Sequence, residues 1–315
     1  MNVFLPTLSQ MANLLIYIVI GYILSRAKIV PGNSPGVLSN LENNVFVPAL
    51  VLGTFMSNFT VAKIGESGKF LLAGLILVLI SMPVAIGISR LCTKDEYLRN
   101  IYTYGLTFSN FGFMGNAVVS ALFPDVFMNY LIFVLPFWFF IYIWAVPALL
   151  IPTKGGRKSI AANLKKLVNP MFIAMFVGMV LGLLDLHIPK FVQSAVVSLG
   201  ACMSPVAMIL TGMTIAKIDL VATFKKASIY VVSIIRLVAI PLVGIAVLAI
   251  FPISAPGIAL CIICELAMPL GLNTIVVPAA YGKDTSVAAG LALISHLLSC
   301  ITIPLIFMLF ELFVK

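Results

Sequence analysis

Charged side chains are scarce in this chain of 315 residues, of which only 9% are Asp, Glu, Lys or Arg. An ordinary soluble domain has about 25% charged residues. Because 62% of the residues are apolar, a soluble fold would lack the polar side chains needed to cover its surface. The composition therefore excludes a soluble globular enzyme, a disordered chain and a nucleic-acid-binding domain. It is typical of an all-α protein that crosses a membrane many times.

Residues that carry catalytic or metal chemistry are also few. The chain has five cysteines and two histidines, His187 and His296. Cys261 and Cys264 form a CxxC pair, but no second Cys or His cluster completes a metal site, so we interpret the cysteines as small packing residues. The sequence has no HExxH motif and no grouping typical of a Ser/His/Asp triad. We therefore expect no enzyme activity, no metal centre and no cofactor.

Long apolar segments are what the chain has in quantity. A helix needs about 20 mainly apolar residues to cross the hydrocarbon core of a membrane. Loops with Pro, Gly, Asn or charged residues separate these segments. The sequence predicts ten transmembrane helices, near residues 5–25, 38–57, 69–90, 100–122, 126–151, 168–186, 191–215, 228–251, 257–280 and 286–313.

The basic residues are distributed unevenly between the two sides of this predicted topology. Of the 19 Lys and Arg residues, 14 fall in the loops after odd-numbered spans, 4 fall on the opposite side, and Arg236 lies inside a span. Cytoplasmic loops of membrane proteins are enriched in Lys and Arg. We therefore expect a multi-pass protein of the cell membrane with both termini outside, which requires an even number of spans. The net charge of +9 then reflects cytoplasmic loops and not a nucleic-acid partner.

The predicted topology divides at the basic segment 152–167 into two halves with five spans each. An odd number of spans per half forces the second half to run inverted with respect to the first. In each half the fourth span, 100–122 or 257–280, is polar and interrupted by glycine. Such a matched pair predicts an inverted-repeat transporter with a binding site near the membrane midplane. We therefore predict repeats at residues 1–151 and 168–315, joined by a cytoplasmic linker.

The fourth span carries Ser109 and Asn110, followed by Gly112, Gly115 and Asn116. Glycine weakens a helix, and an amide buried in a membrane must find hydrogen-bond partners. These residues are typical of a discontinuous helix whose free backbone groups and Asn side chains line a polar cavity. The alternative is tight helix packing through Gly, with Asn joining neighbouring helices. The repetition of the feature in the ninth span favours the cavity.

The ninth span is interrupted by Pro269, Gly271 and Asn273. Proline removes a helical hydrogen bond and clashes with the preceding turn. Where two helices break and cross, two half-helix N-termini point into one cavity with free N–H groups and partial positive charge. That arrangement favours a small organic anion, particularly a carboxylate. We expect the substrate site to comprise Asn110, Gly112, Gly115, Asn116, Pro269, Gly271 and Asn273.

Glu265 lies one turn before this break, deep in the ninth span. A carboxylate at that depth is costly unless it is paired, protonated or bound to an ion. One interpretation is a coupling site, at which Glu265 binds a proton or, together with Ser109 and Asn110, a sodium ion. The alternative is a structural pair with Arg236 or His296.

Two motifs of the sixth span have structural explanations. Asn169-Pro170 is typical of a helix start, because Asn caps the first turn and Pro is tolerated at its first position. Gly178 and Gly182 form a GxxxG motif, which permits close helix packing within the predicted scaffold or at a dimer contact.

Over all ten predicted spans, the sequence resembles the auxin efflux carrier family, which includes plant PIN carriers and bacterial permeases assigned to malate or malonate. The resemblance rests mainly on Ser109–Gly115 and Glu265–Asn273, with support from Tyr281–Asp284, Ser295–Pro304 and Asn169-Pro170. It implies two inverted five-helix repeats with crossed broken helices 4 and 9, a fold similar to sodium/proton antiporters and bile-acid symporters. It also implies a scaffold of spans 1, 2, 6 and 7, a mobile transport unit of spans 3–5 and 8–10, and a homodimer among membrane lipids.

The chain departs from this family in two ways. Many members place a proline in the span 4 crossover, where this sequence has Ser109 and Ala117, and the long loop of many plant carriers is reduced to residues 152–167. Auxin is therefore not the preferred substrate. We expect a secondary active transporter of a mono- or dicarboxylate, such as malate or malonate, that works by alternating access. The alternative is a transporter-like receptor that binds such a ligand without moving it.

Overall fold

The computed structural model describes residues 4–151, 168–186, 188–217, 227–253, 255–280 and 283–314. Within these residues every regular element is helical, and the one β-type contact is an isolated bridge between Ser109 and Leu270. The all-α class predicted from the sequence is therefore confirmed. The predicted linker, residues 152–167, lies outside the described part of the chain.

The helices of the described residues follow one another in this order. Those of residues 4–151 are α1 (Phe4–Arg26), α2 (Ser34–Leu41), the π-helical turn η1 (Glu42–Phe46), α3 (Val47–Asn58), η2 (Val61–Lys63), α4 (Ile64–Cys92), α5 (Glu96–Thr107), the π-helical turn η3 (Phe111–Gly115), α6 (Asn116–Leu122), α7 (Pro124–Phe133), α8 (Leu135–Phe140) and the π-helical η4 (Ile141–Leu150). Those of the later residues are α10 (Pro170–Leu183), α11 (Lys190–Ala201), α12 (Met203–Ile215), α14 (Ala227–Ile234), the π-helical turn η6 (Ile235–Ala239), α15 (Ile240–Ile250), α16 (Pro256–Ala267), α17 (Asn273–Ala280) and α18 (Ser286–Phe313).

Six helical segments of the described chain are long and apolar enough to cross a membrane. The segments expected to form the second, fourth, sixth and ninth spans are not among these six. Three helices in this part of the chain are apolar but shorter, namely Phe111–Leu122, Pro170–Leu183 and Gly257–Ala267. The six long segments are Phe4–Arg26, Val61–Cys92, Pro124–Leu150, Lys190–Ile215, Ala227–Ile250 and Ser286–Phe313.

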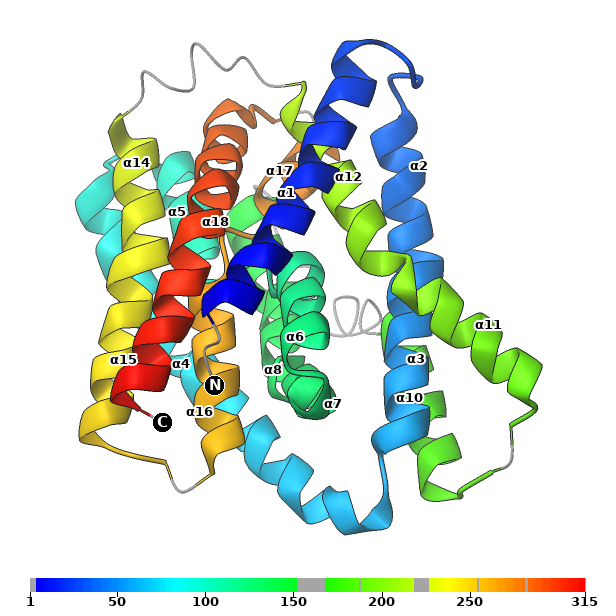
Figure 1. Ribbon diagram of the computed structural model, residues 1–315. Helices are drawn as coiled ribbons and strands as arrows, with labels where there is room; N and C mark the ends of the chain where they lie inside the picture. The colour runs from blue at the N-terminus through cyan, green and yellow to red at the C-terminus, as the bar shows by residue number, and fades with distance from the viewer. Residues whose placement is uncertain are drawn as a thin grey trace.

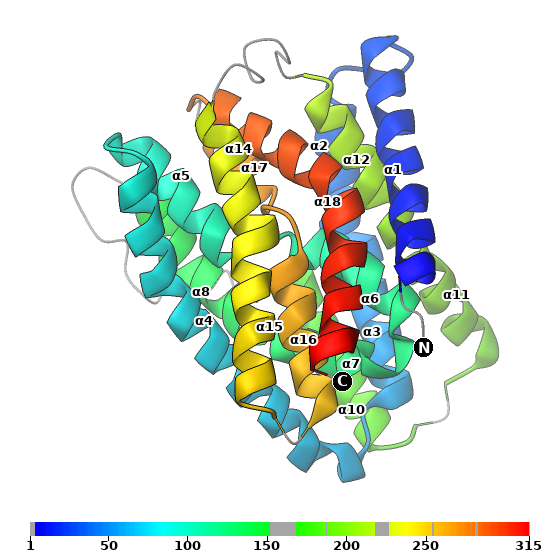
Figure 2. The ribbon, with the colours of Figure 1, turned by 60° about the vertical axis from the view of Figure 1, so that its left-hand side comes forward.

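The helices form two groups that lie side by side (Figures 1 and 2). On the right of Figure 1, α1 packs on α12, and α3 packs on α10 and α11. On the left, α4 packs on α5, α14 packs on α18, and α15 packs on α16, while α6, α7 and α8 lie near the centre. The two groups meet where α1 contacts α6 and α18. The described ends of the chain, in α1 and α18, lie close together in both views.

A close approach of two backbones joins α1 to α12. A Cβ atom placed on Gly21 would overlap the carbonyl oxygen of Ile209, and one placed on Gly212 would overlap the carbonyl oxygen of Ile18. Each glycine is therefore required by the neighbouring helix. Small residues at such contacts let helices approach closely where no hydrophobic force drives them together.

The start of α10 is fixed by a side-chain cap. Oδ1 of Asn169 accepts hydrogen bonds from the backbone N–H groups of Met171 at 3.0 Å and Phe172 at 3.2 Å. Proline follows at the first helical position, where it has no hydrogen bond to lose. The helix start predicted at Asn169-Pro170 is therefore confirmed.

The GxxxG motif of α10 packs against α3 of the same chain. A Cβ atom on Gly178 would lie 2.9 Å from the Cβ of Phe55, and one on Gly182 would lie 2.5 Å from the carbonyl oxygen of Phe59. Both glycines are thus occupied by an internal helix contact, which is one of the two roles that the sequence left open for this motif.

Candidate functional site

Two helical segments are interrupted near their middle. α5 ends at Thr107, and helical geometry resumes at Phe111. In the second half of the chain, α16 ends at Ala267 and α17 begins at Asn273. Each interruption leaves carbonyl groups free at the end of one helix and N–H groups free at the start of the next.

The extended residues of the two interruptions cross and pair with each other. Ser109 and Leu270 form the antiparallel bridge, and the N–H of Asn110 donates to the carbonyl oxygen of Pro269 at 2.7 Å. On the other side, the N–H of Leu270 donates to Oγ of Ser295 at 3.3 Å. One main-chain hydrogen bond across the crossing and one from the main chain to a side chain therefore satisfy two of the N–H groups that the interruptions leave without helical partners.

Arg236 forms hydrogen bonds with the ends of α5 and α16, next to the crossing. Its guanidinium donates from Nη1 to the carbonyl oxygen of Leu106 at 3.1 Å, from Nε to that of Met268 at 3.1 Å, and from Nη2 to that of Glu265 at 2.8 Å. Nη2 also lies 3.8 Å from Oε1 of Glu265, and both side chains are 1% exposed. One buried cation thus serves the C-terminal ends of both α5 and α16.

The Glu265 carboxylate forms this ion pair, and the hydroxyl and backbone N–H of Ser109 lie close enough to interact with it. Ser109 is itself buried, at 4% exposure. The pair with Arg236 corresponds to the structural alternative that the sequence left open for Glu265. His296, the other candidate partner, contacts a different residue.

His296 contacts Asn110 at the crossing. Its Nδ1 lies 2.7 Å from the carbonyl oxygen of Ala292, and its Nε2 lies 2.8 Å from Nδ2 of Asn110. Because a carbonyl can only accept, this network assigns the proton of the neutral ring to Nδ1. Nε2 then accepts a hydrogen bond from the Asn110 amide. The histidine therefore fixes the orientation of an amide whose other edge is available to a ligand.

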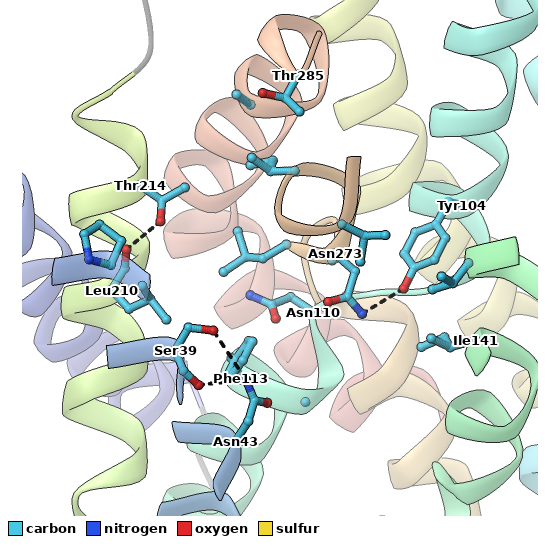
Figure 3. Close-up of a pocket in the computed structure, with 18 of the residues that line it drawn as sticks. Ser39, Asn43, Tyr104, Asn110, Phe113, Ile141, Leu210, Thr214, Asn273 and Thr285 are labelled. Atoms are coloured by element: carbon cyan, nitrogen blue, oxygen red, sulfur yellow. Dashed lines mark hydrogen bonds between the residues drawn. The ribbon is translucent and has the colours of Figure 1, made fainter. Parts of the chain in front are cut away.

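A cavity of about 970 Å³ lies against the crossing and between the two groups of helices. Figure 3 shows Ser39, Asn43, Leu210 and Thr214 on one side of it, and Tyr104 and Asn273 on the other, with Asn110 between them. Residues of α2 and α12 thus face residues of α5, α17 and α18 across the cavity. Its volume is in the range of ordinary small-molecule sites.

The structure brings part of the predicted site together around this cavity. The lining includes both amides that flank the crossing, and Nδ2 of Asn273 donates to the Tyr104 hydroxyl at 3.0 Å. The predicted residues in the lining are Ser109, Asn110, Gly112, Gly271 and Asn273. The predicted residues that do not line it are Gly115, Asn116, Glu265 and Pro269.

Sequence reasoning missed the aromatic residues of the cavity and the polar residues at and beside α2. Tyr104, Trp138 and Tyr142 line it, and the rings of Trp138 and Tyr142 stack with centroids 6.0 Å apart. From the other side Ser39 and Asn43 contribute polar groups. Ser39 and Asn43 could have been found as polar residues at the start of the second predicted span. The aromatic residues could not, because such residues are too common in membrane helices to indicate a site.

Basic loops gather at one end of the cavity. Nζ of Lys217 donates to the carbonyl oxygen of Gly32 at 2.8 Å, and the Tyr97 hydroxyl donates to the carbonyl oxygen of Asp284 at 2.7 Å. Lys217 and Asp284 also line the cavity, which therefore extends to the end of the protein where these loops meet. They are loops for which the charge distribution predicts a cytoplasmic position.

The described residues contain no group of three or more His, Cys, Asp or Glu side chains placed to hold a metal ion.

A family model described as a membrane transport protein matches residues 6–307 of the chain. No curated protein matches it.

Proposed function

Because the chain belongs to the membrane transport protein family, which is the family of the auxin efflux carriers and PIN-like proteins, we propose that it is a secondary transporter of a small organic anion. The family predicted from the sequence is confirmed by this match. Family membership supports transport in general and not an enzyme activity. The single observation that carries the finer proposal is the cavity, which lies at a crossing of two interrupted helices and between two groups of helices.

The helix ends at the crossing suit an anion. η3 and α6 continue from Phe111, α17 starts at Asn273, and both starts belong to the cavity lining. Free N–H groups at a helix start attract negative charge. Asn110 and Asn273 add amide groups that recognise a carboxylate by hydrogen bonding.

The lining favours one carboxylate on an apolar body. Among the described residues that line the cavity, the charged ones are Lys217 and Asp284, both at its open end. The rest of the lining includes the aromatic residues Tyr104, Trp138 and Tyr142. A second carboxylate deep in the cavity would find no basic side chain, and a charge without a partner is costly to bury. We therefore place monocarboxylates ahead of malate and malonate as substrates.

In a transporter that works by alternating access, one group of helices stays fixed and the other moves with the substrate. In this proposal α1, α2, α3, α10, α11 and α12 form the scaffold, and α4–α8 with α14–α18 form the transport unit. The ten-span topology, the two inverted repeats and the cell-membrane location with outside termini belong to the same proposal, as does a homodimer. The cavity lies between scaffold and transport unit and extends to the basic loops, so this conformation is the one open to the cytoplasm.

A phenylalanine at Tyr104 should weaken substrate binding without changing the fold. The Tyr104 hydroxyl holds the Asn273 amide at 3.0 Å, and a hydrogen bond of this kind contributes about 0.5–1.5 kcal/mol, or roughly 2- to 10-fold in affinity. Affinity is measured by thermal shift with phenylacetate and malonate. Tyr142→Phe is the control, because its hydroxyl bonds to none of the described residues although it lines the same cavity. If both variants bound the substrate with equal affinity, Asn273 would not be part of the substrate site.

Glu265→Gln tests whether the buried carboxyl group couples transport to protons. An amide keeps the shape of the side chain but cannot take up or release a proton, so proton-driven uptake should fall to the level seen without a pH gradient. Exchange of substrate across the membrane should persist, since it needs no net proton movement. The exposed Glu66→Gln is the matched control. Unchanged pH dependence of uptake would make Glu265 a structural partner of Arg236.

A receptor that binds the anion without moving it remains the competing function. Uptake of labelled phenylacetate into liposomes that contain the purified protein separates the two. A carrier accumulates label inside the vesicles over time, whereas a receptor retains only the amount bound to protein.

A further inference from the structure

We propose that Arg236 is a tethered cation that takes the place of a bound metal ion at the helix crossing. Its side chain would hold the C-terminal ends of α5 and α16 together permanently, so that no sodium ion is needed to stabilise the crossing. The claim that Arg236 stabilises the crossing depends only on the geometry. The claim that transport does not need sodium rests on the proposed function.

The contacts of Arg236 join the two helix ends. Three carbonyl oxygens, those of Leu106, Glu265 and Met268, accept from its guanidinium at 2.8–3.1 Å. The first belongs to the last turn of α5 and the other two to the end of α16. Carbonyls at a helix end lack intrahelical partners and carry partial negative charge. The planar fork of Arg reaches several such acceptors at once, which a Lys ammonium on the same backbone cannot do.

The buried cluster of Arg236 and Glu265 is balanced in charge. Arg236 and Glu265 are each 1% exposed and lie 3.8 Å apart, so the pair is neutral as a whole. Carbonyl and carboxylate oxygens are the ligands that a hard cation such as sodium prefers. At this crossing the guanidinium occupies the three carbonyl oxygens and faces the Glu265 carboxylate at 3.8 Å. A sodium ion beside it would add an unpaired positive charge to a buried site, which is strongly unfavourable.

In their described parts, the helices that pack on η6 supply no cation that could replace Arg236. η6 packs on α14, α15, α16 and α18. In the described parts of these helices, the ionisable carboxylates and basic side chains are Glu265, His296 and Glu311. His296 is engaged with Asn110 and the Ala292 carbonyl. Arg236 is therefore the cation available to both helix ends.

The test is thermal unfolding of the purified protein in sodium, potassium and choline chloride. The wild-type Tm should be the same in all three salts. Arg236→Ala leaves three buried carbonyls without donors, so its Tm should fall by about 10 °C or more. Low millimolar guanidinium should restore part of this loss, because the free ion carries the same charge and the same planar donors. Urea at the same concentration has a similar shape but no charge and should restore nothing.

Arg90→Ala is the matched control, since Arg90 is exposed in the last turn of α4. Its Tm should change little and should not respond to guanidinium. A wild-type protein that sodium stabilises over choline would overturn the proposal, and so would equal effects of guanidinium and urea on Arg236→Ala.

Arg236→Lys keeps the proposal testable if the alanine variant does not fold. Lysine retains the charge but reaches fewer carbonyls, so Tm should fall to an intermediate value that remains independent of sodium. A sodium-dependent Tm in this variant would contradict a tethered cation. Because unfolding is measured without substrate, failure here is distinguishable from failure of the proposed transport function.

Discussion

Replacing Asn110 with alanine should reduce substrate affinity by roughly 10- to 150-fold, which corresponds to the loss of about 1.5–3 kcal/mol for a hydrogen bond to a charged group. Asn110 lines the cavity at the crossing, and His296 holds one edge of its amide at 2.8 Å. Alanine removes the amide but leaves the main-chain bond from residue 110 to Pro269 in place. The measurement is equilibrium binding of labelled phenylacetate to purified protein.

Asn44→Ala is the control for this variant. Asn44 is an exposed amide on the same chain that does not line the cavity, so binding should be unchanged. Asn116→Ala should also leave binding unchanged, because Asn116 is buried outside the cavity lining and its Oδ1 has no partner among the described residues. Normal binding by Asn110→Ala would place the substrate site elsewhere in the protein.

Leucine at Gly212 should destabilise the protein by more than about 3 kcal/mol, at the upper end of overpacking effects. Even a Cβ atom at this position overlaps the backbone of α1 at Ile18. The backbone cannot move aside as a flexible side chain does, so α1 and α12 would have to separate. Thermal unfolding of the detergent-solubilised protein should show the loss, together with a smaller monodisperse fraction on gel filtration.

Gly87→Leu is the matched control for helix propensity and added bulk. Gly87 also lies within a long apolar helix, α4, but no atom lies within 4 Å of a Cβ atom placed there. Its stability should be unchanged or slightly raised, because leucine favours helices over glycine. Equal stability of the two variants would show that α1 and α12 do not approach as described.

The helix interruptions illustrate what sequence reasoning predicts well. Pro269, Gly271 and Asn273 indicated the break in the ninth span, and helical geometry is lost from Met268 to Leu272. In the fourth span the predicted break rested on Gly and Asn. The non-helical residues are Phe108–Asn110, so Asn110 belongs to the break, whereas Gly112 and Gly115 lie in the π-helical turn that follows. Local helix propensity therefore predicts the region in which each helix breaks. The backbone pairing between the two interruptions determines which residues leave the helix.

The partners of the buried charges could not be predicted. Arg236 was recognisable as a basic residue inside a span, but its acceptors lie 29, 32 and 130 residues away in sequence. The contact of Asn110 with His296 spans 186 residues. Such pairs depend on how helices pack in three dimensions, which periodicity and composition do not specify. The same reason explains why Tyr104 and Asn43 were absent from the predicted site.

The central claim is that the cavity at the crossing carries an organic anion across the membrane. The most direct measurement is uptake of labelled phenylacetate into liposomes containing either the wild-type protein or Asn110→Ala, with unlabelled phenylacetate inside the vesicles to drive exchange. The account predicts saturable accumulation by the wild-type protein and little by the variant. Tight binding by the wild-type protein without any accumulation of label would contradict it.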